Sequence, residues 1–209
     1  MPPPDCTAKV VMIGDSGVGK SKILSSYNGE RFNPTYMQTR ERQIRTSRVQ
    51  VGRRSVELQI WDTPGNPLCR TITAAYMREN VQGVIIVFDV TKDESYYNVQ
   101  HWLKTVNQYV AGREHENCKF VFVGNKNDLA EKLGRKVLIE SGEQLAKQHS
   151  GRYVDTSAKT KENIQKIFQT MAELILGENG EQPKTPDGTN ERGNVDGERQ
   201  KEGFSCTVL

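Results

Sequence analysis

Apolar residues along the chain follow two different spacings, and these two spacings alternate. Alternating or continuous apolar runs bounded by turn residues predict six β-strands, at 7–13, 43–51, 55–61, 83–90, 119–124 and 152–155. Apolar residues three and four positions apart predict helices at 20–28, 71–78, 94–110, 137–149 and 162–176. This alternation is typical of an α/β fold with a six-stranded, mostly parallel sheet and helices on both faces. A tight turn at 52–54 makes one strand pair antiparallel.

The length of 209 residues suits one folded domain with a tail. We expect a short N-terminal extension at 1–6, a folded domain at 7–176 and a flexible tail at 177–205. The tail is rich in Gly, Glu, Asn, Pro and Lys, and it has almost no apolar residues to offset the entropy of ordering. The periodic pattern therefore ends near residue 176.

Charge is divided unequally between these two parts. From Gly177 onward four Lys and Arg face seven Asp and Glu, so the tail carries −3; since the whole chain carries +3, the remainder carries +6. That excess is modest for a folded domain, and nothing in it calls for nucleic-acid binding. No secretion signal or membrane span is expected, and four cysteines without CxxC spacing fit a reducing, cytosolic compartment.

A glycine-rich segment follows the first predicted strand and opens the first predicted helix. Residues 14–21 read GDSGVGKS, which matches the phosphate-binding pattern GxxxxGK[ST] in its required context. Its backbone N–H groups and the helix N-terminus favour an anion. The predicted phosphate-binding residues here are Asp15, Ser16, Gly17, Val18, Gly19, Lys20 and Ser21. Lys20 is expected on the β- and γ-phosphates and the Ser21 hydroxyl on Mg²⁺.

Two later segments, each just past a predicted strand, indicate which base is bound. The carboxylate of Asp128 can accept two hydrogen bonds from N1–H and the exocyclic amine of guanine, whereas adenine cannot pair with it in this way. The predicted guanine-binding residues of these segments are Asn125, Lys126, Asp128, Ser157, Ala158 and Lys159. An ATP-using P-loop enzyme remains an alternative, which Asp128 opposes.

Together these motifs resemble the small GTPase family over residues 7 to about 176. The stretches 59–63 (QIWDT), 70–73 (RTIT) and 88–91 (FDVT) are similar to Rab proteins in particular. The resemblance implies a P-loop NTPase fold of the G-domain type that binds GTP or GDP with Mg²⁺. Rho proteins carry an inserted helix between the two guanine motifs, and no such extra helix is predicted here. Trp102 is interpreted as core packing.

The resemblance also implies residues that sense the nucleotide. Phe32 is expected against the guanine and Tyr36 over the phosphates. Thr39 is expected on Mg²⁺ and the γ-phosphate, Asp62 on the metal through water, and the Gly65 N–H on the γ-phosphate. Loss of that phosphate would then release two segments at once.

The predicted effector face matches the Rab pattern only in part. Trp61 and Tyr76 stand at two positions of the Rab hydrophobic triad, and Ile44 takes the third, where an aromatic residue is usual. Arg40 and Glu41 replace the expected aliphatic residue and glycine. Further arginines make this region basic, which suits an acidic partner or anionic lipid, or equally a solvated surface.

The largest departure lies at residues 62–67, which read DTPGNP where the family has Asp-Thr-Ala-Gly-Gln-Glu. Asn66 occupies the place of the catalytic glutamine, with Gly65 and Lys20 as the other catalytic groups. The carboxamide of Asn66 should fall roughly 1 to 1.5 Å short of the attacking water, because its side chain is one methylene shorter than that of glutamine. Pro64 and Pro67 should restrict motion on either side of Gly65. We expect a slow GTP hydrolase; the alternative is a pseudo-GTPase that holds nucleotide constitutively and acts as a scaffold.

The last four residues, 206–209, read CTVL and fit a CaaX prenylation motif on Cys206. A single lipid without a polybasic patch predicts reversible attachment. We expect a monomer that cycles between the cytosol and the cytoplasmic face of an intracellular or plasma membrane, acting in vesicle traffic. The partners implied are an exchange factor, a GTPase-activating protein, effectors, a prenyltransferase and a solubilising factor of the GDI kind.

Overall fold

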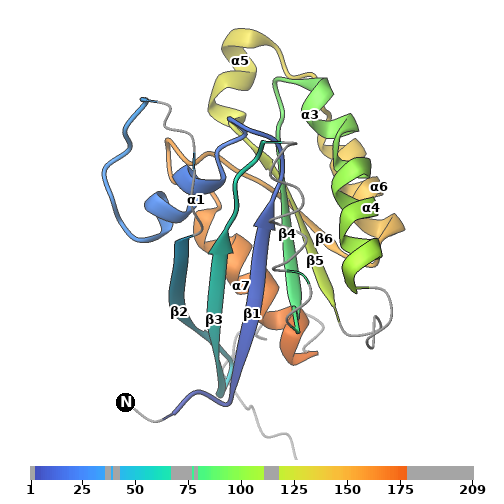
Figure 1. Ribbon diagram of the computed structural model, residues 1–209. Helices are drawn as coiled ribbons and strands as arrows, with labels where there is room; N and C mark the ends of the chain where they lie inside the picture. The colour runs from blue at the N-terminus through green and yellow to red at the C-terminus, as the bar shows by residue number, and fades with distance from the viewer. Residues whose placement is uncertain are drawn as a thin grey trace, which may run out of the picture.

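The computed structural model describes residues 3–35, 39, 43–66, 77, 80–110 and 118–177. Its centre is a six-stranded sheet in the order β2-β3-β1-β4-β5-β6 (Figure 1). The strands are β1 Cys6–Ile13, β2 Gln43–Val51, β3 Arg54–Asp62, β4 Gly83–Asp89, β5 Lys119–Asn125 and β6 Arg152–Asp155. All neighbours pair in parallel except β2 with β3. The predicted mostly parallel sheet with one antiparallel strand is therefore confirmed.

Helices cover both faces of this sheet (Figure 1). They are α1 Lys20–Tyr27, α3 Asp93–Tyr97, α4 Val99–Val110, α5 Ala130–Leu133, α6 Ile139–Gln148 and α7 Ile164–Leu176, with a 3-10 turn η3 at Asn127–Leu129. Of the described helices, α1 and α7 pack on one face and α4 and α6 on the other.

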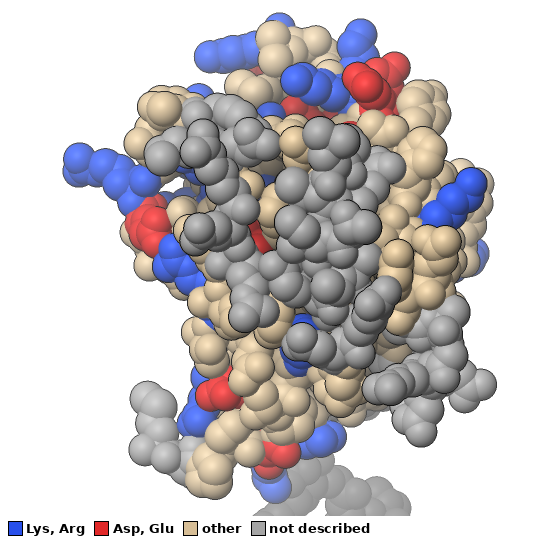
Figure 2. Space-filling view, in the orientation of Figure 1, with Lys and Arg blue, Asp and Glu red and all other residues tan. Residues whose placement is uncertain are grey.

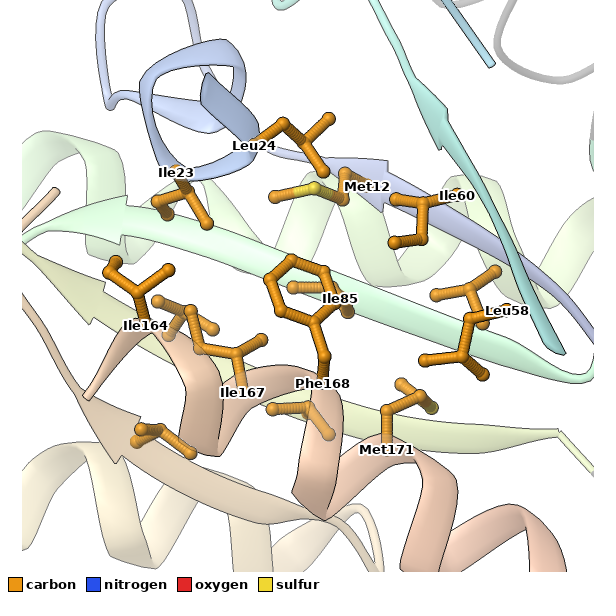
Figure 3. Close-up of a cluster of buried hydrophobic side chains, with 14 of the residues drawn as sticks. Met12, Ile23, Leu24, Leu58, Ile60, Ile85, Ile164, Ile167, Phe168 and Met171 are labelled. Carbon is orange, nitrogen blue, oxygen red and sulfur yellow. The ribbon is translucent and has the colours of Figure 1, made fainter. Parts of the chain in front are cut away.

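The strand β1 shows how the sequence pattern builds both layers. Val10 and Met12 join the cluster under α1 and α7, while Val11 and Ile13 point to the opposite face and join the cluster under α4 and α6. Figure 3 shows Phe168 of α7 among the side chains of the first cluster. Since β1 is buried on both sides, its end is a rigid support for the loop that follows.

Two expectations about the helices and one about the start of the first strand need correction. The predicted helix 94–110 is two helices, because the Asn98 carbonyl accepts from the N–H groups of both His101 and Trp102 and tightens the turn there. A one-turn helix, α5, lies between the guanine motifs, where no extra helix was expected. The first strand, β1, begins at Cys6, one residue before its predicted start. The predicted helix 71–78 lies outside the described residues except for Met77, as does the tail beyond Gly177.

The surface of the described part mixes charges of both signs. In Figure 2, Lys and Arg side chains lie beside Asp and Glu side chains at several places on the face shown. Arg45 of β2 and Glu30 form an ion pair at 3.2 Å. Among the described residues, no helix combines the length and apolar character that crossing a bilayer requires.

Candidate nucleotide-binding site

A cavity of about 380 Å³ lies at the carboxyl ends of the strands, where loops of a parallel sheet converge. Loops after β1, β3, β5 and β6 and the segment after α1 contribute to its walls. The predicted site residues in its lining are Ser16, Gly17, Gly19, Lys20, Ser21, Phe32, Thr39, Gly65, Asn125, Lys126, Asp128, Ala158 and Lys159. Residues far apart in the sequence are thus brought around one space.

The glycine-rich loop needs its glycines for the close approach of backbone to backbone. Gly14 has a φ of 138°, and a Cβ there would lie 2.1 Å from the carbonyl oxygen of Val87. Gly19 has a φ of 105°, and its Cβ would lie 2.3 Å from the side-chain nitrogen of Asn125. Only glycine fits these positions, so the loop is held tightly between β4 and β5.

Lys20 begins α1 and is only 6% exposed. Its Nζ donates to the carbonyl oxygens of Gly14, at 2.6 Å, and Asp15, at 2.9 Å. Burial lowers the pKa of this ammonium group to about 8, and the charges of Asp62 and Asp15 oppose that shift in part. A polyphosphate would supply the negative charge that this buried group lacks.

Three oxygen-bearing side chains meet beside Lys20. The Ser21 hydroxyl donates to Oδ2 of Asp62 at 2.6 Å and lies 2.8 Å from the Thr39 hydroxyl. Oδ1 of Asp62 is buried without a hydrogen-bond partner, and burial raises the pKa of this carboxyl. An orphaned carboxylate oxygen and two hydroxyls match the hard ligands of Mg²⁺, which keeps several waters and takes the rest from phosphates. These residues therefore fit the metal.

The opposite wall, formed by the ends of β5 and β6, is fixed by hydrogen bonds. The Asn125 side chain donates to the Val18 carbonyl at 2.8 Å and accepts from the Ala158 N–H at 3.1 Å. The hydroxyl of Ser157, which is fully buried behind the wall, donates to Asp128 at 2.6 Å. The Asp128 carboxylate is thereby oriented at the cavity edge, where an amine and a ring N–H could pair with it.

The ammonium group of Lys126 lies 2.7 Å from the carboxylate of Asp89, which is itself buried. Lys126 has a φ of 72°, the left-handed conformation that a non-glycine residue rarely adopts. The Lys159 ammonium group lies 3.8 Å from Asp128 on the other side. Lys126 is thus paired with the acid at the end of β4, and Lys159 is paired with Asp128, the carboxylate that is predicted to select the base.

The segment after β3 presses against the phosphate loop. The Thr63 hydroxyl donates to the Met12 carbonyl at 2.6 Å, and Pro64 is buried. A Cβ on Gly65 would lie 2.5 Å from the carbonyl of Asp15 and from Nζ of Lys20. Asn66 follows, half-buried and just outside the cavity lining. The backbone on the two sides of Pro64 is therefore held by the end of β1 on one side and by the phosphate loop on the other.

The predicted effector residues that the structure describes are neighbours. Ile44 of β2 lies opposite Trp61 of β3 in the antiparallel pair; Ile44 is 48% exposed and Trp61 only 7%. The Lys9 ammonium group sits 3.7 Å from the centre of the Trp61 ring. Tyr76, Tyr36 and Cys206 lie outside the described residues.

Two side chains next to the phosphate loop were not predicted as part of the site. Asn98 and Trp102 both donate hydrogen bonds to the carboxylate of Asp15. Trp102 is buried in the core as expected, but its ring nitrogen also reaches the loop. The only sequence signal for such partners was Asp15 itself. A carboxylate inside a loop that attracts anions needs hydrogen-bond donors from elsewhere in the chain.

Comparison with known proteins identifies the family. Residues 9–177 match the model of the Ras family. Ras-related protein SEC4 of Saccharomyces cerevisiae is 37% identical over 171 residues, covering 82% of this chain and 76% of that protein. Ras-related protein Rab-10 of Diplobatis ommata is 37% identical over 192 residues, covering 92% of this chain and 90% of that protein. The chain therefore belongs to the Ras family and is a Rab-like small GTPase.

Proposed function

We propose that the protein is a GTP- and Mg²⁺-dependent switch that recruits effectors at membranes in vesicle transport. The observation that supports this best is one cavity with a phosphate cradle at one end and an oriented carboxylate, Asp128, at the other. The strands that lead into these two groups, β1 and β5, belong to the parallel part of one sheet and are joined through β4. A guanine nucleotide has the chemistry that both ends require.

Within this proposal each end of the cavity has a distinct task. The phosphate loop, from Asp15 to Ser21, and the Lys20 ammonium group bind the phosphates. Ser21 and Thr39 bind Mg²⁺ directly and Asp62 binds it through water; the ion, when bound, neutralises charge on the β- and γ-phosphates. Phe32 packs on the base, which Asp128 selects. The γ-phosphate adds contacts to the segments that carry Thr39 and Gly65, so its loss would loosen both segments and change the shape of the surface.

The test is to release and identify the nucleotide that copurifies with the protein. We expect GDP or GTP in a ratio near one per chain, and exchange that accelerates when Mg²⁺ is chelated. Titration with GDP and ADP should give a strong preference for GDP. A folded protein that takes up neither guanine nucleotide at any Mg²⁺ concentration would overturn the proposal.

We further propose that intrinsic hydrolysis is slower than the roughly 3–5 × 10⁻⁴ s⁻¹ of an unassisted Ras-type site. Asn66 is one methylene shorter than the glutamine that orients water, and a misplacement of about 1 Å can reduce a rate by about 10²-fold. A GTPase-activating protein that supplies a glutamine and an arginine in trans would bypass this defect. Single-turnover hydrolysis at Ras-like speed would refute the slow-hydrolysis proposal.

The pseudo-GTPase scaffold is the second candidate. Burial of Pro64 and the close packing of Gly65 on Asp15 favour it, because both restrict the segment that must move between states. The two candidates differ in how an activating protein affects GTP hydrolysis. It would accelerate hydrolysis by an enzyme, whereas hydrolysis by a scaffold would stay negligible. Bound GTP that persists for days under every condition would favour the scaffold.

Membrane attachment is proposed to depend on a geranylgeranyl group at Cys206, added by a prenyltransferase and shielded in the cytosol by a GDI-like factor. A single chain gives weak, reversible binding, and the acidic tail adds no electrostatic attraction. An exchange factor would load GTP at the membrane. Cys206→Ser should move the protein to the soluble fraction on cell fractionation, and unchanged membrane association would contradict this.

A further inference from the structure

Asp15 is the one acidic side chain inside the phosphate loop. A carboxylate that faced the cavity would repel the phosphates, at a distance where the attraction of Lys20 is needed. The structure turns it the other way. Its Oδ2 accepts from Nδ2 of Asn98 at 2.8 Å, and its Oδ1 accepts from Nε1 of Trp102 at 2.9 Å.

These two donors come from residues 83 and 87 positions further along the chain. Asn98 lies at the junction of α3 and α4, and this junction and the phosphate loop are at the same end of the sheet (Figure 1). Trp102 is 1% exposed and packs in the cluster under α4 and α6. The carboxylate is therefore tied to a part of the core that cannot shift without repacking. We call the side chains of Asp15, Asn98 and Trp102 the Asp15 anchor.

The backbone of Asp15 touches two groups that act on phosphates. Its carbonyl oxygen accepts from Nζ of Lys20 at 2.9 Å. The same carbonyl group lies so close to Gly65 that a Cβ there would approach within 2.5 Å. A displacement of the Asp15 backbone would therefore move the ammonium group of Lys20 and change the space open to Gly65.

We infer that Asp15 is a positioning residue whose carboxylate, held by Asn98 and Trp102, fixes the phosphate loop for Lys20 and Gly65. This inference rests on the proposed nucleotide-binding function and adds to it a link between the phosphate loop and the start of α4. The N-terminal turn of α4 becomes part of the support of the phosphate site, although residues 99–109 of this helix are absent from the cavity lining.

The test exploits the direction of the hydrogen bonds. Asn98→Asp places one carboxylate against another, so we expect release of a fluorescent GDP derivative to accelerate about tenfold, in line with loss of a charge-assisted bond. When Asp15→Asn is added, the new amide N–H at position 15 can donate to the carboxylate introduced at position 98, which reverses the direction of the original hydrogen bond. The amide oxygen at position 15 can still accept from Trp102. The double variant should return to within about threefold of the wild-type rate.

Two further variants separate this role from fold stability. Trp102→Phe keeps a buried ring but removes the Nε1 donor, and should accelerate release about three- to tenfold even where circular dichroism shows an intact fold. Asn107→Asp makes the same chemical change at an exposed position of α4 and should leave the release rate unchanged.

Wild-type rates in Asn98→Asp and Trp102→Phe would overturn the inference, as would a double variant no better than Asn98→Asp. Wild-type protein that binds no guanine nucleotide would overturn the proposed function itself. Normal wild-type binding with insensitive variants would overturn only the role of the anchor.

Discussion

The proposed base-binding end of the cavity and its proposed hydrolytic end differ in the contacts that hold their residues. At the base end, Asn125 is bound through both its oxygen and its nitrogen, and the buried Ser157 hydroxyl orients Asp128. At the proposed hydrolytic end, the residue that would position water is a shortened amide, Asn66, two residues after the buried Pro64. Because the two ends use separate strand termini, we expect that nucleotide binding can remain tight while hydrolysis is slow.

The largest effect is expected at the base end, from Asp128→Ala. This change removes the acceptor for two charge-assisted hydrogen bonds to guanine, each contributing about 1.5–3 kcal/mol. GDP affinity should fall by about 10³-fold, measured by displacement of a fluorescent GDP derivative. Binding of ADP should change little, since adenine does not use this carboxylate.

Glu131→Ala is the matched control for that variant. Glu131 is an exposed carboxylate on α5, three residues beyond Asp128 and outside the cavity lining. Its removal should leave GDP affinity within about twofold of wild type, as for other surface changes. An equal loss in both variants would mean that general electrostatics, and not base recognition, determines affinity at this end.

A smaller effect is expected at the hydrolytic end, where Asn66→Gln restores the missing methylene. Single-turnover GTP hydrolysis should rise by about 10- to 100-fold if the position of the amide limits the rate. GDP affinity should not change, because Asn66 lies outside the cavity lining. The contrast with Asp128→Ala would separate the two ends of the site.

Pro64→Ala, alone and combined with Asn66→Gln, identifies the cause if Asn66→Gln has no effect. Proline fixes φ and lacks an N–H, so its replacement frees the segment before Gly65. Acceleration only in the double variant would assign the slow rate to the proline and the short amide together. Wild-type rates in all three variants would show that neither limits hydrolysis.

Much of the fold was predictable because its signals are local. The strand at 43–51 and the one at 152–155 were predicted with the bounds that the structure gives them. Continuous apolar runs placed β4 and β5 to within a residue. The glycine-rich loop was also local, since its backbone conformation requires glycine at fixed positions.

What escaped prediction depends on contacts between distant residues. The periodicity of 94–110 is helical throughout, so the sequence could not predict the break at Asn98. The break is accompanied by hydrogen bonds from Asn98 to Asp15 and within the turn. The pairing of Lys126 with Asp89 joins the ends of two neighbouring strands. Only the register of the sheet, with Asp89 opposite Asn125, brings these side chains together.

The smallest predicted effect concerns the ammonium group of Lys20, which is expected on the β- and γ-phosphates. In the nucleotide-free protein burial lowers the pKa of Lys20 to about 8, from an ordinary value of 10.5. Bound phosphates stabilise the charged form and raise this pKa, so above pH 8 the complex holds more protons than the free protein. Nucleotide binding must then take up a proton, and affinity falls as pH rises.

Between pH 7 and pH 8.5 we expect about a fourfold loss of GDP affinity, as follows from a group that titrates near pH 8. Calorimetry in buffers of different ionisation enthalpy should detect uptake of a fraction of a proton at pH 8.5 and almost none at pH 6.5. Lys20→Met should bind GDP weakly and without this proton uptake. If that variant kept the full pH dependence, the titrating group would lie elsewhere, and the buried lysine would already be charged throughout this range.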